Sequence, residues 1–463
     1  MSALGGNGYQ YLDLTALGRQ EIWEATPNPS VFRSADRICG RLIGTTSRVG
    51  SRRRLREVEM SSSADRLVSF ADLVVRVGVN VQPGQGVLIG ADIAQLEVAR
   101  AVVEQAYAAG AGWVEVEWTD GPIRRSQLTH GSLESLTKDR PWALQRTAEW
   151  ADEGIATIAL VGQPDSSLFA GVDPAKLTAV RKGEQTARRQ AVMTNRWRWT
   201  VVAAPNPGWA AQVYGEPDVE RLWTAVSKAM RLDEADPVAA WRDRAAVLGA
   251  RAKALDALEV SELTYSGDGT DLTVGLIPGC RWTGGSVTDP AGVTYMPNIP
   301  TEEVFTSPDR RRADGVLRVT KPVVIAGQLV EGLRLTLEGG RITEVTADTG
   351  AEVARAQLDS DEGARSLGEV ALVDKESRIA QADTVFHNTL FDENAGCHVA
   401  WGQSFPFTIP DWQDLSADER FEAGLNTATV HTDVVVGGDG LTVTATTPTG
   451  KIPILIDDEW VLA

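Results

Sequence analysis

The chain has 463 residues, of which 43% are hydrophobic and 23% charged, and its formal net charge is −18. This length predicts two or three domains, and the composition excludes global disorder. The negative charge repels phosphate backbones and anionic membrane surfaces, so we expect no nucleic-acid partner. Three widely spaced cysteines, Cys39, Cys280 and Cys397, argue against a disulfide framework and a thiolate zinc site.

The sequence contains no apolar run near the roughly 18 residues that a membrane-spanning helix needs. Its first residues also lack the charged and then apolar order of a signal peptide. Because unpaired cysteines suit a reducing compartment, we expect a cytoplasmic protein with no membrane partner.

Residues 1–59 differ from the rest of the chain. They begin rich in glycine, continue rich in arginine, contain no lysine and show little apolar periodicity. We therefore expect a disordered extension. The structured protein is predicted to begin near Met60, where residues 61–65 form a helix cap and apolar residues follow at helical spacing from Leu67 to Val77.

Strand and helix patterns alternate after this point. The sequence predicts a buried strand at 86–90, an amphipathic helix at 95–109 and further strands at 113–118 and 154–160. Such βαβ units imply a parallel sheet. Helical residues at 209–256 complete an α/β N-terminal domain that we place at 60–257.

The pattern changes after about residue 258, where short apolar runs are separated by Gly, Asp and Thr. We expect a strand-rich α+β catalytic domain at 258–463. The glycine-rich and aspartate-rich segments at 267–271 and 437–440 are typical of tight hairpins rather than phosphate-binding loops. Apolar runs predict strands at 272–277, 316–319, 333–337 and 441–446.

Three of the four histidines, His387, His398 and His431, fall within about 45 residues of one another. His431 and Asp433 are two positions apart, and on a strand such residues point to the same face. Imidazole and carboxylate are the usual ligands of zinc, cobalt, manganese and iron ions. The His-Thr-Asp triplet therefore predicts half of a metal site.

Two neighbouring glutamates lie in an extended, proline-bounded segment at 297–306. Because alternate residues of an extended chain face opposite sides, we expect one of Glu302 and Glu303 to point inward and the other to be solvated.

Two further polar residues interrupt apolar segments. Glu369 is the lone carboxylate in the strand at 367–373, where it either has a cation as partner or lies on an edge strand in water. His398 follows an acid-rich and amide-rich stretch at 392–397. Buried polar groups rarely lack partners, so both residues are candidate ligands.

These segments together resemble the thermophilic-type metallo-aminopeptidase family over roughly residues 62–463. The family implies an α/β N-terminal domain, a separate catalytic C-terminal domain, a homodimer, and two divalent ions drawn from zinc, cobalt and magnesium. The motifs that carry the resemblance are NIPTEEVFTSP at 298–308, LGEVALV at 367–373, NTLFDENAGCHVAWG at 388–402 and HTD at 431–433.

The resemblance assigns metal ligands residue by residue. Spacing favours Glu303 over its neighbour Glu302 as the glutamate of the first motif. The implied metal ligands are Glu303, Glu369, His398, His431 and Asp433.

One position departs from the family. The tyrosine that follows the metal-binding histidine by seven residues, and is thought to assist catalysis, is here Phe405. A phenyl ring donates no hydrogen bond. If the phenol stabilises the oxyanion, its loss costs about 10²–10³ in rate.

The activity implied is hydrolysis of the N-terminal residue of peptide or aminoacyl substrates. A metal-bound hydroxide would attack the first peptide carbonyl, while Glu302 or Glu303 passes a proton to the leaving amine.

Two alternatives remain. His398, His431 and Asp433 alone form the 2-His-1-carboxylate set of non-haem Fe(II) enzymes, and ring-cleaving dioxygenases resemble the same fold. A non-enzymatic binding protein that kept the metal ligands is the other alternative.

Overall fold

The computed structural model describes residues 63–462, apart from 163–167, 170, 178, 180, 194–195, 268, 327, 383 and 439. The extension predicted at 1–59 and the start of the predicted helix cap lie outside the described residues. Within this described part, no helix is both long and apolar enough to cross a membrane.

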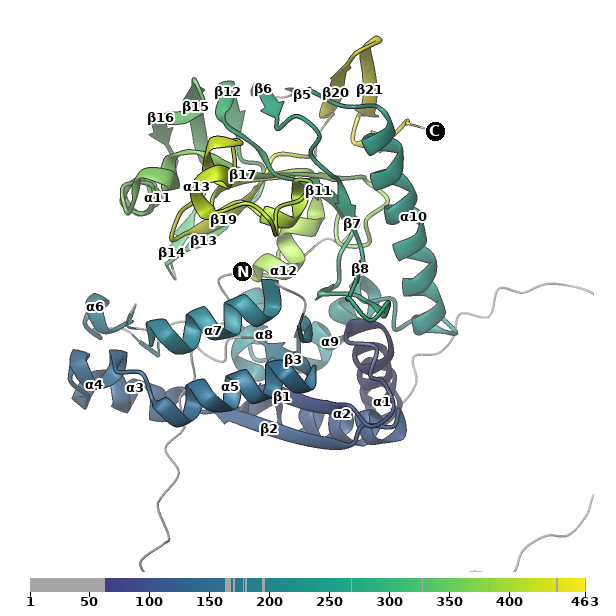
Figure 1. The fold of residues 1–463 in the computed structure, drawn as a ribbon, viewed down its shortest axis with the longest axis vertical. Helices are drawn as coiled ribbons and strands as arrows, with labels where there is room; N and C mark the ends of the chain where they lie inside the picture. Colours follow the sequence, from purple (N-terminus) through teal and green to yellow (C-terminus); the bar gives the residue numbers. More distant parts are fainter. Residues whose placement is uncertain are drawn as a thin grey trace, which may run out of the picture. The chain divides into compact units, whose positions relative to one another are not determined.

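A parallel five-stranded sheet with helices around it forms the first part of the fold (Figure 1). Its strand order is β10-β4-β3-β1-β2, and every pairing is parallel, as the βαβ pattern predicts. The strands are β1 (Gly86–Asp92), β2 (Trp113–Thr119), β3 (Ala156–Val161), β4 (Arg198–Ala203) and β10 (Asn298–Ile299).

The fifth strand was not expected from the sequence. β10 comes from beyond residue 258, in the TEE motif segment, and adds to the edge of the sheet beside β4. The chain then runs on directly to β11 (Glu303–Thr306) in another sheet. The segment before Glu303 is therefore hydrogen-bonded into the first sheet.

Five helices of this part, α3, α4, α8, α9 and α10, begin at side-chain caps that the sequence supplies. Asn206 accepts the Trp209 N–H at 2.9 Å, and Asp236 accepts the Ala239 N–H at 2.9 Å, each followed by a proline in the first turn. The helices are α1 (Ser63–Leu73), α2 (Leu96–Ala108), α3 (Gly121–His130), α4 (Leu133–Thr137), α5 (Pro141–Glu153), α6 (Pro174–Leu177), α7 (Lys182–Met193), α8 (Pro207–Tyr214), α9 (Val219–Ala229) and α10 (Pro237–Ala257), with a π-helical turn at Val74–Gly78.

Two antiparallel sheets make up most of the rest, which confirms the strand-rich prediction. A five-stranded sheet has the order β19-β18-β17-β11-β7, and an eight-stranded sheet has the order β16-β15-β12-β6-β5-β20-β21-β22. The boundaries at 60–257 and 258–463 remain a prediction.

The strands of the five-stranded sheet are β7 (Thr283–Gly284), β11, β17 (Leu367–Val373), β18 (His398–Gly402) and β19 (His431–Val435). The eight-stranded sheet contains β5 (Glu262–Gly267), β6 (Thr270–Leu276), β12 (Pro308–Arg318), β15 (Arg334–Glu338), β16 (Arg341–Thr346), β20 (Thr442–Thr447), β21 (Gly450–Ile456) and β22 (Glu459–Trp460). Two small pairs, β8 (Val287–Thr288) with β9 (Thr294–Tyr295) and β13 (Val323–Ile325) with β14 (Gln328–Val330), and helices α11 (Ala351–Leu358), α12 (Thr389–Asp392) and α13 (Ala417–Glu422) complete it.

One of the two predicted hairpins is present. The turn at 267–271 joins β5 to β6, which pair antiparallel. The hairpin predicted at 437–440 is wrong, because this segment passes from β19 in one sheet to β20 in the other. The N–H groups of Gly438, Gly440 and Leu441 donate to the Asp458 carboxylate, which satisfies the backbone without strand pairing.

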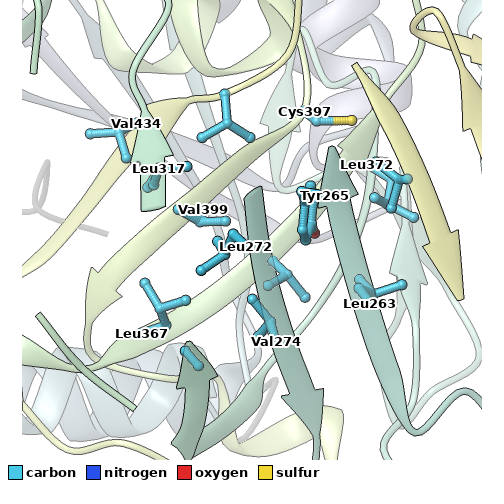
Figure 2. Packing of buried hydrophobic residues seen from close by; sticks show 14 of the residues in the cluster. Leu263, Tyr265, Leu272, Val274, Leu317, Leu367, Leu372, Cys397, Val399 and Val434 are labelled. Carbon is cyan, nitrogen blue, oxygen red and sulfur yellow. The ribbon is translucent and has the colours of Figure 1, made fainter. Parts of the chain in front are cut away.

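The core of this half lies between the two antiparallel sheets. Because side chains alternate along a strand, every second residue of the five-stranded sheet faces the eight-stranded sheet. Its other face is left for the polar residues described below. Figure 2 shows part of this buried cluster, with Leu367, Leu372, Val399 and Val434 from one sheet and Leu263, Tyr265, Leu272 and Val274 from the other.

Gly402 ends β18 in a backbone conformation that L side chains rarely adopt. Its φ is +100°, and a Cβ there would lie 2.1 Å from the Val430 carbonyl oxygen. We expect Gly402→Ala to lower the free energy of unfolding by about 3 kcal/mol, since it adds a steric clash to the φ strain. Urea unfolding measures the loss.

Gly450 is the matched control. Its φ is +127°, and a Cβ added there would meet no atom of the described residues within 4 Å. Gly450→Ala should therefore cost only the conformational strain, about 1 kcal/mol. Equal losses in the two variants would contradict the steric argument.

Candidate metal centre

The polar residues that interrupt the strands of the five-stranded sheet lie on one face of it. Val304, Val370, Val399 and Val434 point into the core between the sheets. Their neighbours along the strands point the other way. The residues brought together on this second face are Glu303 on β11, Glu369 on β17, His398 on β18, and His431 and Asp433 on β19.

Strand register explains why residues so far apart in sequence meet. Glu369 pairs with Ala400, and Ala400 pairs with Asp433 on its other side, so these two carboxylates lie across one intervening strand. β17 lies in the middle of the sheet, which rules out the edge-strand alternative for Glu369. The Glu369 side chain is only 6% exposed.

The five predicted ligands fall into two overlapping groups, and Glu369 belongs to both. Within each group the ligand atoms lie within 4.8 Å of one another. Three donor atoms at this spacing can contact one cation. A carboxylate common to both groups has two oxygens, one for each. The groups are Glu303, Glu369 and His398, and Glu369, His431 and Asp433.

The shortest contacts join imidazole nitrogens to carboxylate oxygens. His398 Nε2 is 2.9 Å from Glu303 Oε2. His431 Nε2 is 3.1 Å from Glu369 Oε2 and 3.3 Å from Asp433 Oδ1. Yet Glu303 Oε2 is buried and makes no hydrogen bond of acceptable geometry with any described residue.

The opposite ring nitrogen of each histidine is held by a backbone carbonyl. His398 Nδ1 lies 3.3 Å from the Gly396 oxygen, and His431 Nδ1 lies 2.7 Å from the Gln403 oxygen. A carbonyl only accepts, so each Nδ1 carries the proton. Nε2 then points toward the carboxylates, as metal-binding histidines require.

The pKa values of these groups reflect an excess of negative charge in the cluster. Burial opposes charge on the imidazoles, but the close carboxylates of Glu303 and Asp433 outweigh it and raise the pKa of His398 and His431 to about 10. Burial raises the pKa of Glu369. Despite its own burial, Asp433 has a lowered pKa because His431 lies beside it.

Glu393 is an acid beside the site that sequence analysis missed. It begins the 3₁₀ turn Glu393–Ala395, which packs against β19. Burial, and then the charges of Asp433 and Glu303, raise the pKa of its carboxyl group well above the ordinary value. The signal was present in the DEN stretch before His398. Its neighbour Asp392 instead accepts the N–H groups of Phe386 and Asn388.

Glu302 points away from this cluster. As alternation predicts, Glu302 and Glu303 face opposite sides, but Glu302 is 0% exposed rather than solvated. Its two carboxylate oxygens lie 2.6 Å from Arg231 Nη2 and 2.5 Å from Arg244 Nε. The expectation of a solvated side chain was wrong because Arg231 and Arg244, from the segment of α9 and α10, cover this position.

Phe405 lies beside the cluster. Its ring makes an edge contact with His431, with the ring centroids 5.1 Å apart, and it also contacts Phe305 and Phe407. All three phenylalanine side chains are half-buried. The position that matches the family tyrosine therefore adjoins a predicted metal ligand.

The donor set fits divalent cations. Three carboxyl groups and two imidazoles share one largely buried face, and a buried carboxylate oxygen lacks a hydrogen bond there. Buried anions need a cation or a proton close by. Oxygen and imidazole nitrogen are ligands for zinc, cobalt, manganese or iron.

Known proteins resemble this chain over nearly all of its described length. The model of the thermophilic metalloprotease family, M29, matches residues 63–460. Aminopeptidase T of Thermus aquaticus is 38% identical over 411 residues, which cover 87% of this chain and 100% of that protein. Aminopeptidase PepS of Streptococcus thermophilus is 37% identical over 407 residues, which cover 86% of this chain and 98% of that protein.

A solved structure shares the fold. Wild-type AmpT from Thermus thermophilus matches with a TM-score of 0.79 and 35% sequence identity, over 86% of this chain and 100% of that one. The chain therefore belongs to the thermophilic metalloprotease family M29, as its four sequence motifs predict, and is accordingly a metal-dependent hydrolase.

Proposed function

We propose that the protein is an aminopeptidase that removes the first residue of peptides at a centre of two divalent ions. The observation that carries the proposal is the pair of ligand groups that share Glu369. Two groups with one common carboxylate are the arrangement expected for two neighbouring ions. The relatives named above are aminopeptidases, which supports the same substrate class here.

In this proposal, Glu303 and His398 hold one ion and His431 and Asp433 hold the other, with Glu369 between them. Ions bound there would supply a hydroxide nucleophile near neutral pH and would polarise the scissile carbonyl. The excess of acidic groups favours a substrate that brings a positive charge or an amine, such as a free peptide N-terminus.

Of the two glutamates considered as proton carriers, Glu302 is the less suitable. Its carboxylate points away from the predicted ligands and lies against the guanidinium groups of Arg231 and Arg244. The Glu303 carboxylate instead faces the cluster. A cytoplasmic location and a homodimer belong to the same proposal.

The geometry disfavours the dioxygenase alternative. A 2-His-1-carboxylate site needs both histidines around one ion, whereas His398 and His431 belong to different ligand groups here. The relatives named above are aminopeptidases, which gives no support to an iron enzyme or to a binding protein.

Metal content tests the shared carboxylate. The parent protein should bind two divalent ions per subunit and hydrolyse aminoacyl-nitroanilides. Glu369→Ala should lose both ions and on the order of 10³-fold in kcat/KM, while His398→Ala should retain roughly one ion. Elemental analysis and initial rates measure these outcomes.

Glu376→Ala is the control, because this acidic side chain is exposed and follows β17. Glu376→Ala should leave the metal content and kcat/KM unchanged. A single iron per subunit in the parent, with cleavage of an aromatic ring, would establish the dioxygenase instead.

Metal uptake should release protons. In the metal-free protein the pKa of His398 and of His431 is about 10, so at pH 8 both imidazoles are protonated. Ions bind neutral imidazole, and we expect roughly two or more protons to be released per subunit at pH 8. Affinity should therefore rise from pH 7 to pH 9.

Calorimetric titration of zinc in two buffers with different ionisation enthalpies counts the protons. Histidines with an ordinary pKa near 6.5 would release almost none at pH 8. A count below about one half would contradict the close pairing of imidazoles and carboxylates.

Restoring the missing hydroxyl should raise turnover. Phe405→Tyr places a hydrogen-bond donor on the ring beside His431, and we expect kcat to increase by up to about 10²-fold. Phe407→Tyr is the matched control, since the Phe407 ring contacts those of Phe305 and Phe405. No effect of Phe405→Tyr would show that the ring alone suffices, and an equal gain in both variants would contradict a role specific to position 405.

A further inference from the structure

A second buried cluster of charges lies behind the metal centre. It contains three arginines from the segment of α9 and α10 and two acids that flank strands of the five-stranded sheet. Arg231 follows α9, and Arg244 and Arg251 lie seven residues apart on α10, hence on one helix face. The acids are Glu302, directly before β11, and Asp374, directly after β17.

The contacts form a chain of alternating charge. Arg231 Nη2 and Arg244 Nε lie 2.6 and 2.5 Å from the two oxygens of Glu302. Arg244 Nη2 is 3.7 Å from Asp374 Oδ1, and Arg251 pairs with the other Asp374 oxygen. Both acid side chains are almost inaccessible, at 0% and 2% exposed.

The two acids lie at neighbouring ends of the strands that carry Glu303 and Glu369. Glu302 precedes the first residue of β11, and Asp374 follows the last residue of β17. Glu303 is paired with Val373 in the antiparallel register. Glu302 precedes Glu303 and Asp374 follows Val373, so the two acids lie opposite each other one position beyond this pair. Like charges placed across a strand pair destabilise it. Arg244 reaches both acids and removes this conflict.

Backbone contacts extend the cluster to a third strand connection. The Glu302 N–H donates to Asn394 Oδ1 at 2.6 Å, and Arg244 Nη2 donates to the Glu302 carbonyl at 3.4 Å. Asn394 follows Glu393, and its own carbonyl accepts the Ser377 hydroxyl at 2.6 Å. The segments that carry Glu303 and Glu393 are thus fixed to each other.

We propose that Glu302, held by Arg231 and Arg244, is a positioning residue that sets the distance of Glu303 from His398 and Glu369. It acts through the backbone of β11, without touching metal or substrate. This inference rests on the proposed metal centre. It assigns the two neighbouring glutamates opposite tasks, one as ligand and one as anchor.

The buried arginines make the anchor specific. α10 packs against β7 and β11, so the Arg244 guanidinium group extends from a fixed helix, while Arg231 lies in the turn that follows α9 (Figure 1). The planar guanidinium groups of two arginines engage opposite oxygens of one carboxylate and restrict its rotation. A displacement of Glu302 is therefore passed to the adjacent Glu303.

Zinc affinity of the folded protein tests the proposal, with two variants. Glu302→Gln keeps the shape of the side chain but removes the charge, and Arg231→Gln removes one cation while Arg244 remains. We expect each to weaken zinc binding by about 10–100-fold, the usual effect of losing a partner behind a metal ligand. The visible absorption of the cobalt-loaded protein should change as well.

Asp289→Asn is the matched control. Asp289 forms a similarly buried ion pair with Arg198 at 3.0 Å, with side-chain exposures of 10% and 6%. It should lower the melting temperature but leave zinc affinity unchanged, because it acts on stability alone. Arg231→Gln keeps the test valid if Glu302→Gln does not fold, since Arg231 is partly exposed at 15%.

Unchanged zinc affinity in both folded variants would overturn the positioning role. If, in addition, kcat alone fell for Glu302→Gln, the residue would be a proton carrier instead. Absence of any divalent-ion binding by the parent protein would overturn the proposed function itself, and the positioning role with it.

Discussion

The structure depends on how buried negative charge is compensated. Glu303, Glu369 and Asp433 bring three carboxyl groups to one sheet face, with two imidazoles as the neighbouring cations. In the absence of metal, the neighbouring carboxylates outweigh burial and raise the pKa values of both imidazoles, so the imidazoles hold extra protons. Divalent ions replace the protons with stronger and more localised charge. The face can therefore stay buried only with protons or metal bound.

The buried charge of Glu302, the residue before Glu303, is compensated in a different way. Glu302 is as buried as Glu303, but its charge is balanced by arginines that belong to the chain. A covalently fixed cation gives a permanent structural contact. An exchangeable cation leaves coordination positions for water and substrate. The alternation of a single extended segment thus separates an anchoring acid from a metal-binding acid.

Sequence patterns predicted the elements whose partners are local. The His-Thr-Asp spacing places His431 and Asp433 on one face, and Glu369 interrupts an otherwise apolar strand. Contacts between distant segments could not be predicted in this way. β10 joins a sheet made by residues far upstream, and the arginines around Glu302 come from α9 and α10. Glu393 was missed because no periodicity distinguishes it from neighbouring polar residues.

We expect the residue at position 405 to affect the turnover of substrate rather than the binding of metal. The five predicted ligands are all present, and the Phe405 ring keeps an edge contact with His431. A phenol hydroxyl at this position would add a hydrogen-bond donor without changing the ligand set. Such a donor acts on charge that develops only in the transition state, so its absence affects kcat rather than the affinity for metal. We therefore expect Phe405 to lower the rate of hydrolysis without altering the predicted metal ligands.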